Sequence, residues 1–197
     1  MKVLFIILTV LSSFMADMER LTLKSDFVVT ISETATQPLS YTGSFVMRGE
    51  RFELQMMQME IAYDGKTLYM YSAETDEIQL TEPTQEELLQ ANPLAFAKAV
   101  VKDCEVLERD KNNGDKLIVL VPRDKTKTYG IGRIELVLMV NGQSSITNHQ
   151  SPMYLPASVE MKEGKRTTLL KLKNAEYIST TPTFKLNKPG AYVNDLR

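Results

Sequence analysis

The sequence predicts a mainly β protein, built as a strongly curved antiparallel sheet or barrel. From residue 17 onward, apolar residues mostly alternate with polar ones, which is the period of a half-buried strand. Turn residues interrupt this alternation about every ten positions, which predicts roughly nine to eleven strands joined as hairpins. Three segments are apolar on both faces, so part of the sheet is expected to be covered on two sides. A sheet of so many hairpins avoids exposed edges by curling.

Residues 1–16 are predicted to be a secretory signal peptide. Lys2 precedes an apolar run over residues 3–11, and Ser12, Ser13 and Ala16 follow as small residues near a cleavage site. Cleavage after Ala16 would leave residues 17–197 as a single domain. The apolar run is well short of the ~20 residues that a membrane-spanning helix needs, so its length disfavours the alternative of a membrane anchor.

Composition and charge limit the classes of protein and partner that remain possible. The chain has 197 residues, of which 43% are hydrophobic and 24% charged, enough for one core of ordinary size. Its formal net charge is −2 and the charges are mixed along the chain, so no basic stripe predicts nucleic acid as a partner. Cys104 is the only cysteine and does not follow the apolar run, which predicts neither a disulfide nor an acylated lipoprotein. We expect a soluble monomer after export.

The first clear strand covers residues 41–48, where alternate residues form an apolar face. Apolar residues then continue at even positions up to Met56 and at odd positions from Met57 to Tyr63. This change of phase predicts a bulge or a tight turn near Met56 and Met57. Asp64-Gly65 predicts a hairpin turn directly afterwards.

The strand segments that are apolar on both faces follow later in the chain, at residues 68–71, 117–121 and 134–140. Something must therefore cover the second face of the sheet. Turns between further strands are predicted by Asn112-Asn113-Gly114-Asp115, Asn141-Gly142 and Glu163-Gly164-Lys165.

Two helices interrupt the strands in the middle of the chain. Residues 84–87 form a capping box, which predicts a short helix that ends near Gln90. Asn92 as N-cap and Pro93 as first helical residue predict a second helix to about Val101. Because both lie between strands, they can pack across one face of the sheet.

Residues that carry catalytic chemistry are scarce. His149 is the only histidine, which excludes a multi-histidine metal site, and it is expected in a solvated loop. Cys104 begins a predicted strand without a neighbouring histidine, which favours a buried, inert thiol over a nucleophile. The sequence contains no phosphate-binding loop, no G-x-S-x-G and no zinc-ligand spacing. We therefore expect no enzyme, cofactor or metal; a hydrolase that uses carboxylates alone is the remaining catalytic alternative.

The most distinctive feature is apolar. Methionines at positions 47, 56, 57, 59 and 70 interleave with aromatic residues. Methionine is flexible and polarizable, so it suits a surface that accepts variable apolar shapes. Composition alone leaves two interpretations open, a solid core rich in methionine and a pocket for lipid.

Several stretches resemble the LolA-type periplasmic lipoprotein carriers and the related outer-membrane acceptors. FVMRGERF at residues 45–52 resembles a strand-turn-strand of the family, and YDGKTLYMY at residues 63–71 matches its hairpin most closely. Asn92-Pro93-Leu94 stands at the place of its mid-chain helices, and residues 117–122 and 184–194 resemble its later strands and terminal segment. The chain departs from the family at Gly49, where proline is usual. Cleavage after Ala16 would also leave little chain for the family's N-terminal helix.

The resemblance implies an incomplete, half-open β-barrel in which a few short helices act as a lid over an apolar cavity. It implies a location in the periplasm of a Gram-negative bacterium, where acyl chains of lipoproteins or phospholipid would be carried from the inner to the outer membrane. An inner-membrane ABC transporter would load the carrier, and an outer-membrane acceptor would unload it. A non-catalytic sensor or regulatory binding module on the same fold is the alternative.

The resemblance and the alternation of apolar residues together predict which residues form the site. Residues expected to line the cavity are Phe45, Met47, Leu54, Met56, Tyr69 and Tyr71, although period two fixes only which residues share a face and not which face is concave. Arg48 stands where the family places a strand-end basic residue that bonds to the lid. The resemblance implies that Arg48 is a latch to the helix at residues 93–101, and an exposed arginine at a hairpin is the alternative.

Overall fold

The computed structural model describes residues 2–92, 94, 100–141 and 152–197. The elements in chain order are α1 (Lys2–Arg20), β1 (Thr22–Glu33), β2 (Leu39–Arg48), β3 (Arg51–Met56), β4 (Met59–Tyr63), β5 (Leu68–Ser72), β6 (Glu77–Thr81), α2 (Gln85–Ala91), η1 (Val101–Asp103), β7 (Cys104–Asp110), η2 (Asn112–Gly114), β8 (Lys116–Pro122), η3 (Lys125–Thr128), β9 (Arg133–Asn141), β10 (Met153–Glu163), β11 (Arg166–Ile178) and β12 (Tyr192–Asp195).

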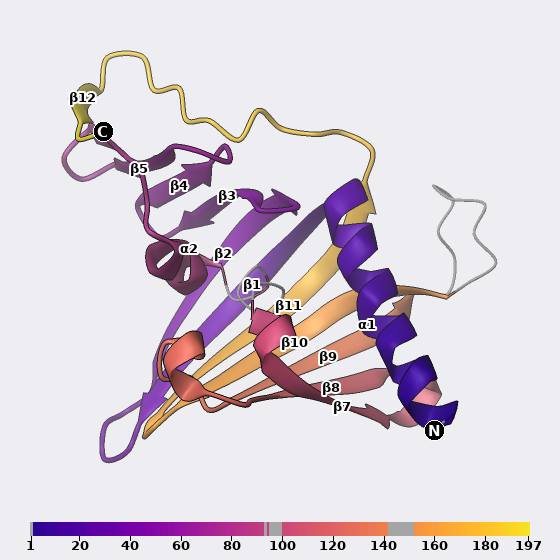
Figure 1. Cartoon of the computed structure of the whole chain (residues 1–197). Coiled ribbons are helices and arrows are strands. Elements are labelled where there is room, and N and C mark those ends of the chain that lie inside the picture. The colour runs from indigo at the N-terminus through magenta and orange to yellow at the C-terminus, as the bar shows by residue number, and fades with distance from the viewer. Residues whose placement is uncertain (1, 93, 95–99, 142–151) are drawn as a thin grey trace.

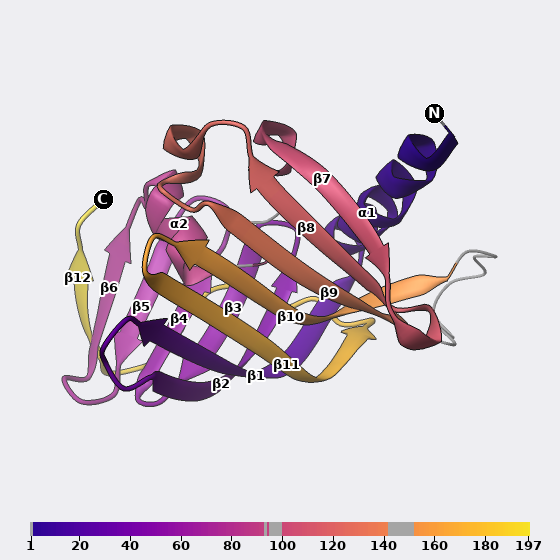
Figure 2. The same ribbon diagram turned by 90° about the horizontal axis from the view of Figure 1, so that it is seen from below.

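All strands of the described ranges belong to one sheet, in the order β12-β6-β5-β4-β3-β2-β1-β11-β10-β9-β8-β7. β1 pairs with both β2 and β11, so the first strand joins the two halves of the sheet. β12 and β7 stand at opposite ends of the order, and the sheet curves without closing (Figures 1 and 2). The predicted mainly β, half-open barrel is therefore confirmed.

Local sequence explains the hairpins of the first half. Met57 adopts a left-handed φ of +55° between β3 and β4, at the predicted change of phase. Gly65 has a φ of +103° in the next turn, and Asp64 Oδ1 accepts hydrogen bonds from the backbone N–H groups of Lys66 and Thr67 at 3.0 and 2.9 Å. Both predicted turns are confirmed.

α1 and α2 lie over the concave face of the sheet (Figure 1). α2 begins at the predicted capping box, in which Thr84 Oγ1 accepts from Glu87 N–H and Glu87 Oε2 accepts from Thr84 N–H. Its short length and capping agree with the sequence. Of the predicted second helix, Pro93 and residues 95–99 fall outside the described residues, as do Gly142 of a predicted turn and His149.

α1 was not expected as part of the folded core. Leu11, Phe14 and Met18 recur at the spacing of one helical face, and all three are buried against the sheet, with Phe14 only 1% exposed. The predicted cleavage point after Ala16 falls inside this helix. Among the described residues, one long helix therefore supplies most of the cover on the concave face, where a few short helices were expected.

The opposite, convex face of β3–β6 is covered by the C-terminal segment. After β11 the chain crosses above these strands and ends in β12, which pairs in parallel with β6 (Figure 1). Phe184 in this segment is fully buried, and its backbone N–H donates to Glu53 Oε1 at 2.9 Å. This segment is the cover that the two-sided apolar pattern of β5 required. It also explains the twelfth strand, beyond the nine to eleven predicted.

Candidate functional site

A cavity of about 340 Å³ lies on the concave face, between the sheet and the α2 side of the cover. Its volume is within the range of roughly 300–1,000 Å³ found for small-molecule sites. Most of its lining is apolar. The lining residues are Phe27, Val29, Ile31, Tyr41, Phe45, Phe52, Leu54, Met56, Ile61, Glu86, Ala91, Asn92, Leu94, Tyr129, Ile131, Met161, Glu163, Arg166, Thr168 and Leu170.

Strand alternation and register place the lining side chains on one face. Phe45 of β2 stands opposite Leu54 of β3, which in turn stands opposite Ile61 of β4. Val29 of β1 stands opposite both Tyr41 of β2 and Leu170 of β11. Side chains of paired residues lie on the same side of a sheet, so these pairs form a continuous apolar wall across five strands.

Gly43 shapes the sheet at one end of this wall. A Cβ atom at Gly43 would lie 2.5 Å from Phe27 Cζ and 2.2 Å from the carbonyl oxygen of Gln55. The absence of a side chain therefore lets the Phe27 ring lie directly against the sheet. The Phe27 ring is also packed against the Phe45 ring, with centroids 6.2 Å apart.

The lining becomes polar toward one end of the cavity. Along β11 it changes from Leu170 through Thr168 to Arg166, and Arg166 stands opposite Glu163 across the β10–β11 turn. Glu86 of α2 also contributes to the lining. The tips of the β1–β2 and β10–β11 hairpins lie on the same side of the molecule as α2 and η3 (Figure 1). The polar end is thus at the rim of the half-barrel.

The loop after η3 presents Tyr129 to this polar end. Tyr129 is 38% exposed and has a left-handed φ of +52°. The loop is held by the fully buried Thr128, whose hydroxyl donates to the carbonyl of Ile131 at 2.7 Å. A non-glycine residue in this conformation persists only where its surroundings fix it, so the loop holds Tyr129 in place.

The structure brings together only part of the predicted lining. Phe45, Leu54 and Met56 line the cavity. Met47 points to the same face but is 1% exposed in the solid core, outside the cavity.

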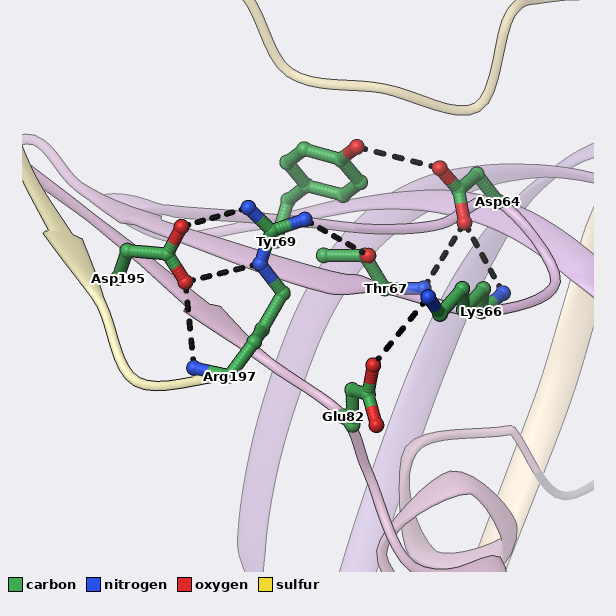
Figure 3. Close-up of polar contacts among 7 residues, drawn as sticks. All are labelled: Asp64, Lys66, Thr67, Tyr69, Glu82, Asp195 and Arg197. Atoms are coloured by element: carbon green, nitrogen blue, oxygen red, sulfur yellow. Dashed lines mark hydrogen bonds and ion pairs between the residues drawn. The ribbon is translucent and has the colours of Figure 1, made fainter.

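Tyr69 and Tyr71 lie on the convex face, contrary to the expectation that they share the lining. The Tyr69 hydroxyl donates to Asp64 Oδ2 at 3.1 Å, next to the cluster in which Arg197 binds Asp195 and Thr67 (Figure 3). Burial and this hydrogen bond raise the pKa of Tyr69. Lys188 of the C-terminal segment lies 4.8 Å from the centroid of the Tyr71 ring. β5 presents Leu68 and Met70 to the concave face, because Leu68 pairs with Tyr63 and Met70 with Ile61.

Much of the cavity lining comes from residues that the sequence analysis did not predict. Phe27, Val29 and Ile31 come from β1, and Met161, Thr168 and Leu170 come from β10 and β11. The alternation in residues 27–31 marks a strand face, but pairing between β1 and β11 joins residues more than 130 positions apart. No local pattern specifies such a pairing.

Arg48 does not form the predicted latch. Because Met47 faces the core, Arg48 points to the opposite face of β2, where its Nη1 donates to Thr181 Oγ1 at 2.9 Å. Thr181 also lies 3.3 Å from Thr22 Oγ1. Arg48 thus holds the start of the C-terminal segment to the sheet, and most of the helix predicted as its partner, residues 93–101, lies outside the described residues.

We therefore expect Arg48→Leu to leave the cavity unchanged. Binding of a fluorescent acyl probe should stay within about twofold of wild type, and urea unfolding should show a loss of at most about 1 kcal/mol, as for an exposed polar contact. Thr181→Val is the matched control and should cause a similar loss. A large defect in probe binding or release with Arg48→Leu, but not with Thr181→Val, would contradict this assignment.

Cys104 begins β7 and is buried, as predicted. Burial, with a contribution from Asp103, raises the pKa of its thiol, which disfavours the reactive thiolate. Among the described residues, no group of three or more His, Cys, Asp or Glu side chains is placed to hold a metal ion.

No protein-family model and no curated protein matches the sequence. Among solved structures, the chain is similar to an uncharacterized conserved protein from Thermus thermophilus, with a TM-score of 0.55, 11% sequence identity, and coverage of 93% of this chain and 98% of that chain. The two chains share one fold. The half-open barrel that the sequence resemblance implied is thus also found in a solved structure.

Two further solved structures show weaker likenesses to this chain. A LolA superfamily protein from Nitrosomonas europaea has a TM-score of 0.46 at 9% identity, with coverage of 89% of this chain and 97% of that chain. A putative outer membrane lipoprotein-sorting protein domain from Vibrio parahaemolyticus has a TM-score of 0.45 at 8% identity, with coverage of 87% and 92%. In the described part of the chain, no helix combines the length and apolar character of a membrane span.

Proposed function

We propose that this protein binds acyl chains of lipoproteins or lipids in the concave cavity and carries them through the periplasm. The single observation that supports this most is the cavity itself, which is apolar along its strands and polar at the rim. An amphiphile has the same division, with an apolar tail and a polar head. The sequence stretches that resemble LolA-type carriers add to this support.

The energetics suit a carrier. Burying one methylene group is worth about 0.8 kcal/mol, so a chain of ~14 carbons offers roughly 11 kcal/mol before the costs of binding. The aromatic and branched side chains of the wall, such as Phe45, Leu54 and Ile61, replace water around the tail. Met56 and Met161 can adjust to chains of different shape, because methionine has several rotatable bonds.

Transport requires partners that load and unload the cavity. We propose an inner-membrane ABC transporter as the donor and an outer-membrane acceptor, as the resemblance implies, and export to the periplasm of a Gram-negative bacterium. The proposal assigns no catalytic step to the protein. A sensor on the same fold would bind the same ligands but would not pass them on.

The proposal is tested by native mass spectrometry of the protein isolated from the periplasm of its host. We expect co-purifying lipoprotein or phospholipid, and transfer of that ligand to acceptor membranes when they are added. Bound lipid without transfer would favour the sensor. Repeated isolation of empty protein that also rejects fluorescent acyl probes would rule out the carrier.

A further inference from the structure

The rim of the cavity carries charges of both signs on two paired residues. Arg166 begins β11 and Glu163 ends β10, and the two residues are paired in register across the hairpin. Both belong to the cavity lining and both are exposed. The ion pairs among the described residues involve neither side chain. A cation and an anion therefore stand on neighbouring strands at the polar end without an ion pair between them, and both are available to a ligand.

The residues just inside the rim form a layer between these charges and the apolar wall. Thr168 stands opposite Ile31 and Met161, one pleat deeper than Arg166. Tyr129 also lines the cavity, and Tyr41 lies one pair deeper than Thr168, opposite Val29. Tyrosine presents an apolar ring with a polar tip, which suits the boundary between a buried tail and a hydrated head. The cavity thus has three zones in the order apolar, amphipathic and charged.

We propose that the ligand enters tail first and that Arg166 and Glu163 recognise a zwitterionic headgroup, with a phosphate on Arg166 and an ammonium group on Glu163. This inference rests on the proposed function and names the ligand class of the same site. The planar guanidinium of arginine can donate two parallel hydrogen bonds to phosphate oxygens, and a carboxylate accepts from an ammonium group.

The charge pattern disfavours other headgroups. A purely anionic head would gain from Arg166 but would lie beside Glu163, with Glu86 also on the lining. An uncharged head would leave both rim charges with water only. Charges that complement those of a ligand contribute more to specificity than to total affinity. We therefore expect a modest preference that adds to the affinity of the tail.

The test compares three single-chain probes of equal acyl length, each below its micelle concentration: monoacylglycerol, lysophosphatidylethanolamine and lysophosphatidylglycerol. Their affinities are measured by displacement of a fluorescent acyl probe at low salt. We expect the zwitterionic probe to bind about two- to fivefold more tightly than the other two, as exposed ion pairs allow. This preference should weaken as salt is added, because exposed charges are screened.

Two rim variants and one control make the test specific. Arg166→Gln should lower the affinity for both phosphate-bearing probes, and most for the anionic probe, whose phosphate would then lie beside Glu163 without a neighbouring cation. Glu163→Gln should raise the affinity for the anionic probe and remove the preference for the zwitterionic one. Lys165→Gln removes a charge from the same hairpin tip at a residue outside the cavity lining, and it should leave the preference intact.

The outcomes separate this inference from the proposed function. Equal affinities for all three probes in wild type, or an unchanged preference in both rim variants, would overturn headgroup recognition while leaving the acyl-binding cavity. Failure of every probe, monoacylglycerol included, would instead refute the cavity as a lipid site, and headgroup recognition with it.

Discussion

Leu54→Asp is expected to reduce acyl-probe affinity by at least about tenfold, because a carboxylate within an apolar site must lose hydration when a tail enters. Leu54 is half-buried and lines the cavity between Phe45 and Ile61, so its replacement changes the wall where three strands contribute side chains. The measurement is equilibrium titration with a fluorescent acyl probe, alongside the far-ultraviolet circular dichroism spectrum of each variant.

The matched control for this variant is Leu107→Asp. Leu107 is a strand leucine of β7, 40% exposed, and is paired with Val119 outside the cavity lining. Leu107→Asp adds the same charge, but outside the cavity lining, and probe affinity should therefore remain near that of wild type. A filling variant, Ile61→Trp, should also weaken binding without adding a charge. Unchanged probe affinity in both cavity variants would show that the tail binds elsewhere.

Phe14→Ala is expected to destabilise the full chain by about 3–5 kcal/mol, the usual cost of deleting a large buried aromatic side chain. Phe14 is 1% exposed and belongs to the same core cluster as Leu23 and Met47. Ser12→Ala is the control, since Ser12 lies on the exposed side of the same helix. Urea unfolding followed by circular dichroism measures both variants.

The same experiment bears on the predicted signal peptide. Cleavage after Ala16 would remove Leu11 and Phe14 from the core, so a chain that starts at Asp17 should be less stable than Phe14→Ala in the full chain. Mass spectrometry of the exported protein identifies its N-terminus directly. If the chain from Asp17 equals the full chain in stability, or if Phe14→Ala costs less than about 1 kcal/mol, α1 would not contribute to the core in the way that we infer.

If both proposals hold, headgroup preference and tail binding depend on different parts of the cavity. The apolar wall of β1–β4 and β11 would supply affinity, whereas the rim at Arg166 and Glu163 would supply selection. Changes at the wall should therefore weaken all probes alike, and changes at the rim should reorder them. This difference allows the two properties to be measured independently in one set of variants.

Local sequence was sufficient for features that depend on neighbouring residues. The capping box at Thr84 and Glu87 predicts the start of α2, and Asp64-Gly65 predicts a hairpin, because each arrangement satisfies backbone hydrogen bonds within a few residues. The change of phase at Met56 and Met57 likewise predicts the β3–β4 turn. The same alternation assigns Phe45, Leu54 and Met56 to faces that the hairpins bring together.

Tyr69 and Tyr71 could have been placed correctly from the turn between β4 and β5. That turn pairs Tyr63 with Leu68, so the concave face continues through Leu68 and Met70 and leaves the two tyrosines on the other side. Arg48 follows the same rule, since it neighbours the core residue Met47. Both errors came from assigning faces strand by strand without carrying the register through each hairpin.

What the sequence alone determined about this protein is its mainly β fold, the turns near Met57 and Gly65 and the helix that begins after Thr84. Only the tertiary structure decided that β1 pairs with β11, that α1 fills part of the concave face and that the C-terminal segment covers the convex one. These contacts join residues far apart in the chain. Their free energy comes from burial of apolar surface, which is not directional and leaves no local pattern that names the partner.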